Sequence, residues 1–129
     1  AIKKSCYDTE KPAMKLEFLF IPTSDLNASL ALYRDGLGFT ELWREGDATV
    51  ALTLPGSEVQ VMLDANDPQA PAGPIFVVES VTDFHAKRPE ALSVIEEPAD
   101  IPGGAMATYQ EPGGAVLYIL DQSTDAEAG

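Results

Sequence analysis

Short apolar blocks of strand length recur along most of the chain, and turn residues separate them. The first block, residues 16–22 (LEFLFIP), is aromatic-rich and ends at a proline, which is typical of a buried strand. Residues 98–104 are rich in Pro and Gly and are expected to form a loop. We predict strands over residues 16–22, 39–44, 49–54, 59–64, 75–78, 92–96, 105–111 and 115–120.

Two stretches carry helical spacing instead. The short polar side chains of residues 23–25 can accept hydrogen bonds from backbone N–H groups, so they predict a helix start. One apolar stripe follows at helical spacing, and Gly36 and Gly38 end the helix. The stripe consists of Leu26, Leu30, Tyr33 and Leu37. A shorter helix is predicted over residues 82–88, because Pro89 cannot continue it.

The order of elements is therefore β-α-β-β-β, repeated once. Pro55-Gly56 leads to Leu63-Asp64 over the same distance as Pro112-Gly113 leads to Leu120-Asp121, which supports an internal repeat. We predict an α+β fold with one domain over residues 14–122, made of modules 15–65 and 74–122. Each helix can cover one sheet face, and the sister module is the economical cover for the other.

The two ends of the chain differ from this pattern. Residues 1–13 are polar and aperiodic, so we expect a loosely ordered extension outside the fold, and residues 123–129 are expected to be a flexible tail. Residues 1–6 contain basic side chains without a following apolar stretch, so no signal peptide is expected. A single cysteine, Cys6, excludes a disulfide within the chain and favours a cytoplasmic setting.

The charge balance restricts the choice of partners. The net charge is −13, from 21 acidic and 8 basic residues, which disfavours nucleic acid and membrane surfaces. No apolar run approaches the roughly 20 residues that span a bilayer. The acidic excess serves either solubility or the attraction of a cationic ligand.

Five stretches, taken in their order along the chain, carry a resemblance to a known family. Residues 20–26 (FIPTSDL) and 29–39 (SLALYRDGLGF) resemble the first strand-helix junction and first helix of the vicinal-oxygen-chelate superfamily. Residues 78–87, 96–98 and 111–114 resemble its later junction, late strand and final hairpin. This superfamily includes glyoxalases, bleomycin-resistance proteins and extradiol dioxygenases. The resemblance implies an open, curled mixed-sheet barrel around a cavity, with the helices outside, and a homodimer.

The resemblance also implies a divalent metal held by His, Glu or Gln from the first and last strands of each module. Here those positions fall on Phe18 and Tyr118, which suit a metal poorly. The fourth-strand position falls on Val61, or on Gln60 or Met62 after a slip of one residue. The fifth-strand position falls on Gly73, Pro74 or Phe76. We therefore predict no metal and no cofactor, as in a bleomycin-resistance-like branch without the metal ligands.

Aromatic side chains remain to line the cavity, and they suit a flat or cationic organic molecule. The predicted ligand-binding residues are Phe18, Phe20, Trp43, Tyr109 and Tyr118. The alternative is that these rings fill the core. The only histidine, His85, is read as an exposed helix residue rather than a metal ligand or a catalytic group.

The leading hypothesis is a metal-free small-molecule-binding protein that sequesters a cationic or aromatic compound. The rival is a diverged lyase, isomerase or oxygenase that uses cavity carboxylates or an unrecognised metal site. Its candidate carboxylates are Glu41, Glu58 and Glu111, for which a solvated strand edge is the competing interpretation. A third interpretation is an interaction module whose cavity is filled by its own side chains.

Overall fold

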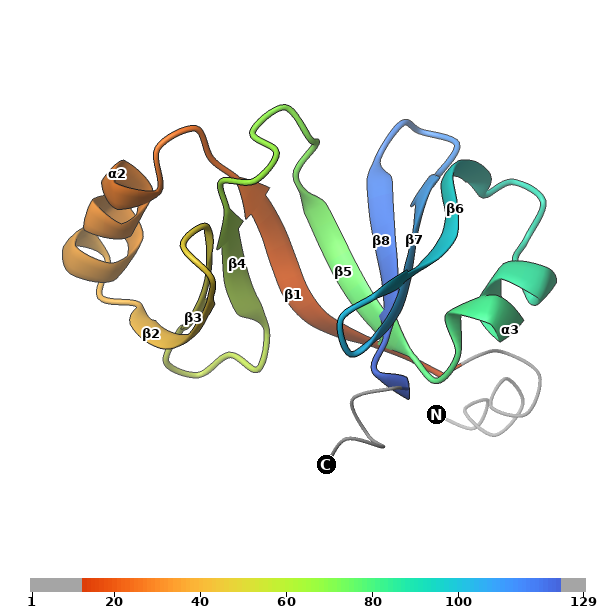
Figure 1. Ribbon diagram of the computed structural model, residues 1–129, viewed down its shortest axis with the longest axis horizontal. Coiled ribbons are helices and arrows are strands. Elements are labelled where there is room, and N and C mark those ends of the chain that lie inside the picture. Colours follow the sequence, from red (N-terminus) through yellow and green to blue (C-terminus); the bar gives the residue numbers. More distant parts are fainter. Residues whose placement is uncertain (1–12, 124–129) are drawn as a thin grey trace. The chain divides into compact units, whose positions relative to one another are not determined.

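The computed structural model describes residues 13–123, and the predictions for residues 1–12 and 124–129 lie outside them. The described residues divide into two compact units, residues 17–75 on the one hand and residues 13–16 with 76–123 on the other (Figure 1). We call the first and second β-α-β-β-β repeats along the chain the first and second modules. The repeated β-α-β-β-β order is confirmed. The first module contains β1 (Met14–Pro22), α2 (Leu26–Leu30), η1 (Ala31–Gly36), β2 (Thr40–Glu45), β3 (Thr49–Thr53) and β4 (Gln60–Asp64). The second contains β5 (Gly73–Val78), α3 (Val81–Lys87), β6 (Ser93–Ile101), β7 (Gly104–Gln110) and β8 (Val116–Asp121).

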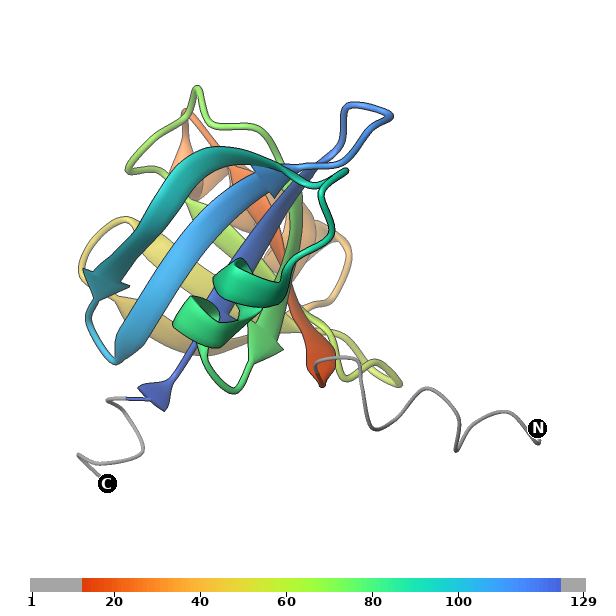
Figure 2. The same ribbon diagram turned by 90° about the vertical axis from the view of Figure 1, so that its right-hand side faces the viewer.

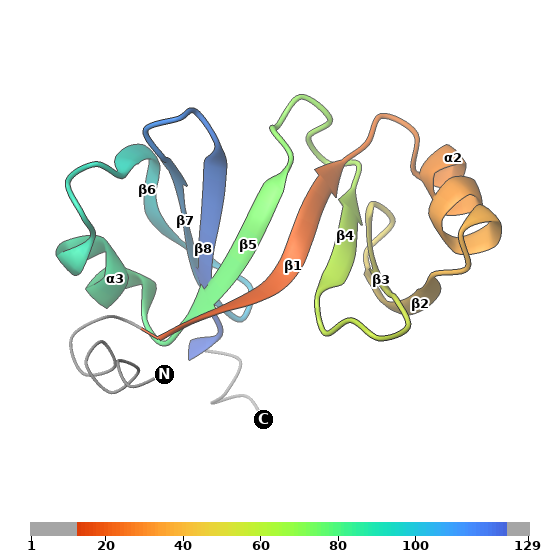
Figure 3. The same cartoon turned by 180° about the vertical axis from the view of Figure 1, so that it is seen from behind.

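The first module is a mixed sheet with its helix on one side. The strand order is β2-β3-β4-β1, in which β1 runs parallel to β4 and the other pairs are antiparallel. Helix α2 and η1 lie beside this sheet (Figure 1 and Figure 3). Because alternate strand residues point to opposite faces, one set packs under the helix. That buried core consists of Leu30, Val50, Leu52, Val61 and Leu63.

The helix of the first module begins where the sequence predicts. Asp25 is the N-cap, and its side chain accepts a hydrogen bond from Ala28 N at 3.0 Å. The later turns widen into the π-helical segment η1, in which Leu37 N donates to Leu32 O. The predicted apolar stripe is therefore carried partly on π-helical turns, which its spacing alone did not indicate.

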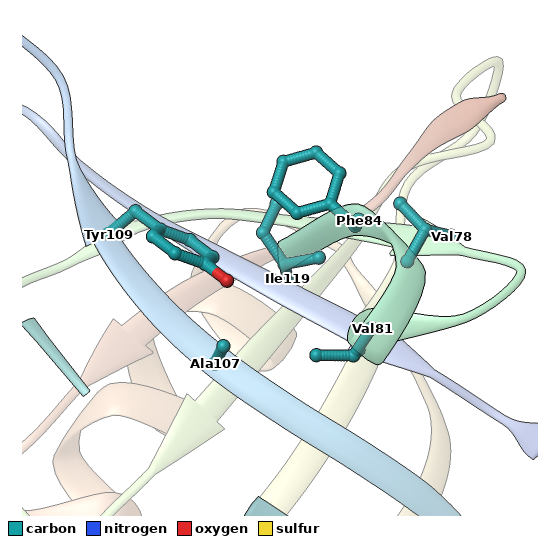
Figure 4. Close-up of a cluster of buried hydrophobic side chains, with 6 residues drawn as sticks. All are labelled: Val78, Val81, Phe84, Ala107, Tyr109 and Ile119. Atoms are coloured by element: carbon teal, nitrogen blue, oxygen red, sulfur yellow. The ribbon is translucent and has the colours of Figure 1, made fainter. Parts of the chain in front are cut away.

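The second module repeats the arrangement, with strand order β5-β8-β7-β6. Its helix α3 is capped by Ser80 and lies against one face of the sheet, next to β7 and β8 (Figure 2). Side chains from α3 and from β5, β7 and β8 form one buried cluster (Figure 4). The cluster consists of Val78, Val81, Phe84, Ala107, Tyr109 and Ile119. No helix in residues 13–123 is long and apolar enough to cross a membrane.

One predicted loop is wrong. Strand β6 continues through Ile101, whereas residues 98–104 were expected to form a loop. Its pairing with β7 shifts between Glu96 and Ala99, and Pro98 lies inside this irregular interval. A proline is tolerated there because its missing N–H is not needed by the ladder.

Asp121 joins the elements of the second module. Its side chain is buried and accepts hydrogen bonds from Val81 N at 2.7 Å and Ala105 N at 3.0 Å. Ser123 adds a backbone N–H and a hydroxyl to the same carboxylate. Gly104 makes this approach achievable, because a Cβ there would overlap the Asp121 carbonyl oxygen. One carboxylate thus holds the start of α3 and the start of β7.

Asp121→Ala should lower the free energy of unfolding by about 2 kcal/mol or more, because it leaves the backbone N–H groups of Val81 and Ala105 without a hydrogen-bond acceptor. The matched control is Asp64→Ala at the end of β4, where the side chain accepts from Asn66 N at an exposed turn. That change should cost about 0.5–1 kcal/mol. Urea denaturation measures both, and equal losses would contradict the role given to Asp121.

The hydrogen bonds to Asp121 also predict that the stability of the fold depends on pH. Burial alone would raise the pKa of Asp121, but the hydrogen bonds from Val81, Ser123 and Ala105 outweigh it and the pKa is lowered. The unfolded chain, with an aspartate pKa of about 3.9, therefore takes up the proton first as the pH falls. Stability from Asp121 is present above that value and is lost as the pH falls through the folded pKa. Asp121→Asn should flatten this decline in acid denaturation, and Asp64→Asn should retain it.

Candidate functional site

The first module has a second sheet face, on the side away from α2 and η1, which we call its helix-free face. Strand alternation and the ladder registers place Phe18, Phe20, Trp43, Gln60 and Met62 on it. A bulge between Glu41 and Trp43 shifts the β2 register so that Trp43 pairs with Ala51 on this face. The structure therefore brings together three of the residues that the sequence analysis proposed for ligand binding.

These side chains form an ordered polar-aromatic group. The rings of Phe18 and Trp43 meet edge to face, with centroids 6.1 Å apart and an interplanar angle of 86°. Trp43 Nε1 donates to Gln60 Oε1 at 3.2 Å, and Gln60 is the ladder partner of Phe18. Because an indole N–H can only donate, the bond orients the Gln60 amide and leaves its NH₂ group turned away from the indole.

The fourth strand takes the slipped register that the sequence left open. Val61 packs in the core under α2, and Gln60 and Met62 share the face of Phe18. Gln60 is thus a site residue that the sequence analysis named only as an alternative. Alternation offered a signal, because Val61 and Leu63 are aliphatic while Gln60 and Asp64 are polar. Glu58 lies exposed before β4 begins and is not on this face.

The second module also has a helix-free face, on the side of its sheet away from α3. Tyr118 lies there as the ladder partner of Thr108, and both side chains are buried, at 6% exposure each. Thr108 in turn pairs with Glu96 of β6, and its hydroxyl donates to Glu96 Oε1 at 3.4 Å. Tyr118 therefore shares its face with two polar residues that the sequence analysis did not single out.

Tyr109 is placed differently. It is fully buried in the cluster beneath α3, with its ring 5.6 Å from that of Phe84 (Figure 4). Its hydroxyl shares a hydrogen bond of 2.7 Å with His85 Nδ1. Burial raises the pKa of Tyr109, with a smaller contribution from Glu97 and an opposing one from Arg88. Tyr109 therefore points away from the face that carries Tyr118 and lies in the core cluster beneath α3.

His85 is not the exposed residue that the sequence predicted. Its side chain is 23% exposed and lies between buried Tyr109 and surface Glu97, whose Oε1 is 3.2 Å from His85 Nε2. The helical stripe did not reveal this, because the partner hydroxyl comes from a strand that lies far along the sequence. The imidazole connects α3 to β6 and β7.

The carboxylates considered as general bases are already engaged. Glu41 lies on the helix side of the first module, where Arg44 Nε and Arg34 Nη1 approach it at 2.8 and 3.2 Å. Hydrogen bonds and charge from Arg44, and then from Arg34, lower the pKa of Glu41. Backbone donors at Gly113 and Ala115 likewise lower the pKa of Glu111 in its hairpin. Both groups favour the ionised form and are weak bases.

The residues at the family's metal positions do not fit a metal ion. Phe18 and Gly73 supply no donor atom, and Tyr118 supplies a phenol, which is a poor ligand unless it ionises. Gln60 Oε1 accepts a hydrogen bond from Trp43 Nε1, and a single neutral amide oxygen is too few donors to hold a metal ion. Among residues 13–123, no group of three or more His, Cys, Asp or Glu side chains is placed to hold a metal ion.

This chain is similar to a known protein family and to solved structures. The family described as Glyoxalase/Bleomycin resistance protein/Dioxygenase superfamily matches residues 15–119. Methylmalonyl-CoA epimerase from Mycobacterium tuberculosis has a similar fold, with a TM-score of 0.64 and 16% identity over 89% of this chain and 92% of that chain. A glyoxalase/bleomycin resistance protein/dioxygenase superfamily member from Vibrio splendidus 12B01 has a TM-score of 0.51 and 20% identity, over 86% of this chain and 99% of that chain. No curated protein matches the sequence.

The side chains at the family's metal positions predict how the stability of the protein responds to added metal ions. Adding Zn²⁺ or Mn²⁺ to EDTA-treated protein should leave the unfolding temperature unchanged, because the face around Phe18 and Gln60 lacks a competent ligand set. A real site filled at one hundred times its dissociation constant would add about 2.7 kcal/mol of stability. Differential scanning fluorimetry gives the readout. A stoichiometric rise for either ion would contradict the assignment.

Proposed function

We propose that this chain, which belongs to the Glyoxalase/Bleomycin resistance protein/Dioxygenase superfamily, is a metal-free small-molecule-binding protein. Like the bleomycin-resistance branch suggested by the sequence resemblance, it would hold a flat organic compound rather than transform it. The observation that carries the proposal is the group of Phe18, Trp43 and Gln60 on the helix-free face of the first module. The expected homodimer and the expected cytoplasmic setting remain parts of this proposal.

The group offers two complementary contacts to a ligand. Trp43 is partly exposed and provides apolar ring surface on the side of the sheet away from the helix, and Phe18, which is 6% exposed, supports the indole from below by its edge-to-face contact. The Gln60 amide, oriented by Trp43, provides N–H donors for a carbonyl or a ring nitrogen. An apolar surface with few oriented polar groups is the usual composition of a small-molecule site.

The charges around the first module favour neutral or cationic ligands over anionic ones. Arg34 and Arg44 lie on the helix side and are paired with Glu41, so they are not placed to hold an anion near Phe18. The chain as a whole carries a net charge of −13. Long-range attraction therefore acts on cations.

The carboxylates that the rival enzyme hypothesis named as general bases are engaged in other contacts. A lyase or isomerase needs a base that reaches the substrate with a pKa near the working pH. Glu41 is committed to two arginines, and Glu111 is committed to its own hairpin. A described carboxylate that remains on a helix-free face is Glu96, which accepts a hydrogen bond from the Thr108 hydroxyl.

Binding can be followed through Trp43, which is the only tryptophan of the chain. Flat aromatic compounds with a carbonyl or ring nitrogen should change its fluorescence and raise the unfolding temperature. Gln60→Met should weaken this binding by about tenfold, because it keeps the volume but removes both the donors offered to the ligand and the acceptor that holds Trp43 Nε1. A panel of neutral and cationic heteroaromatic compounds provides the probes.

The matched control is Gln69→Met, at an exposed turn in the segment that connects β4 to β5. It should leave both the fluorescence response and the unfolding temperature as in the wild type. If no compound in the panel alters Trp43 emission or stability, the proposed function is wrong.

A further inference from the structure

Three polar side chains form one row across the helix-free face of the second module. Glu96 on β6 pairs with Thr108 on β7, and Thr108 pairs with Tyr118 on β8. The adjacent ladder pair is Met106 and Leu120, which are apolar. A carboxylate, a hydroxyl and a phenol are therefore aligned beside apolar surface.

The carboxylate in this row is held in place but not neutralised. Thr108, which is 6% exposed, donates its hydroxyl to Glu96 Oε1 at 3.4 Å. Within residues 13–123, no basic side chain forms an ion pair with Glu96. Its neighbour Glu97 points to the opposite side, where it meets His85 Nε2. Two adjacent glutamates thus differ in that only one has a potentially cationic partner.

We propose that the row of Glu96, Thr108 and Tyr118 recognises the positively charged nitrogen of an organic monocation, such as a protonated aromatic amine. The exposed Glu96 carboxylate supplies charge and accepts N–H donors, and the Thr108 hydroxyl fixes the position of that carboxylate. This inference rests on the small-molecule binding proposed above and names the charge of its ligand.

The same row is unsuited to other ligands of similar size. A divalent metal needs several oxygen donors around it, and the row offers one carboxylate with neutral hydroxyl groups. A carboxylate or phosphate ligand would meet Glu96 with like charge and no basic partner. A neutral aromatic compound could contact the apolar positions but would gain nothing from Glu96.

Two nearly isosteric probes isolate the charge. 1-Naphthylmethylamine is protonated at pH 7.5, and 1-naphthalenemethanol is neutral, with the same ring and linker. Isothermal titration calorimetry on the full chain should show tighter binding of the amine. Glu96→Gln should weaken the amine by about tenfold and leave the alcohol unchanged, since it removes the charge while keeping the shape.

Glu97→Gln is the matched control, because it removes the same charge one residue away on the other side of the strand. It should leave the affinities of both probes at wild-type values, which excludes a general effect of net charge. Equal weakening by the two variants, or an unchanged ratio of amine to alcohol in Glu96→Gln, would overturn the proposal for Glu96 while small-molecule binding stands. If neither probe binds the wild type and the Trp43 panel is also negative, the proposed function itself fails. Circular dichroism checks that each variant is folded.

Discussion

A β-strand can present its side chains to only two faces, and in both modules a helix occupies one of them. Everything that concerns function follows from this division. Aliphatic side chains such as Val61 and Ile119 take the helix side, where they form the buried clusters. The remaining face is then available for residues with other chemistry, and it collects Trp43 and Gln60 in one module and Glu96 and Tyr118 in the other.

The sequence predicts the elements well because their signals are local. The Asp25 cap and the first strand depend on neighbouring residues, and the structure confirms both. The facing of side chains is harder to predict, because it depends on register. A slip of one residue moves a side chain to the other face, which is why the repeat pointed to Val61 where the structure places Gln60. The extension of β6 past Pro98 also depends on a pairing irregularity that no local pattern shows.

The carboxylates of this acidic chain differ more in their partners than in their charge. Glu41 is held by arginines, Glu111 by the amides of its own hairpin, and Asp121 by amides from two different elements. Each of these groups has a structural task, and its lowered pKa records the stabilised ionised form. Net charge alone therefore does not identify a functional carboxylate. Glu96 differs because the contact that holds it comes from a neutral hydroxyl.

Trp43 and Tyr109, two of the predicted ligand-binding residues, show how the same chemical need can be met in different places. Each carries a polar group that needs a hydrogen-bond partner once the ring is packed. Tyr109 satisfies it with His85 inside the helix-side core, and no buried side-chain polar atom in residues 13–123 lacks a partner. Trp43 satisfies it with Gln60, but on the face away from the helix, and in doing so it orients an amide whose donors remain to be used. A satisfied polar atom marks a binding site only where its partner still has bonding capacity toward a ligand.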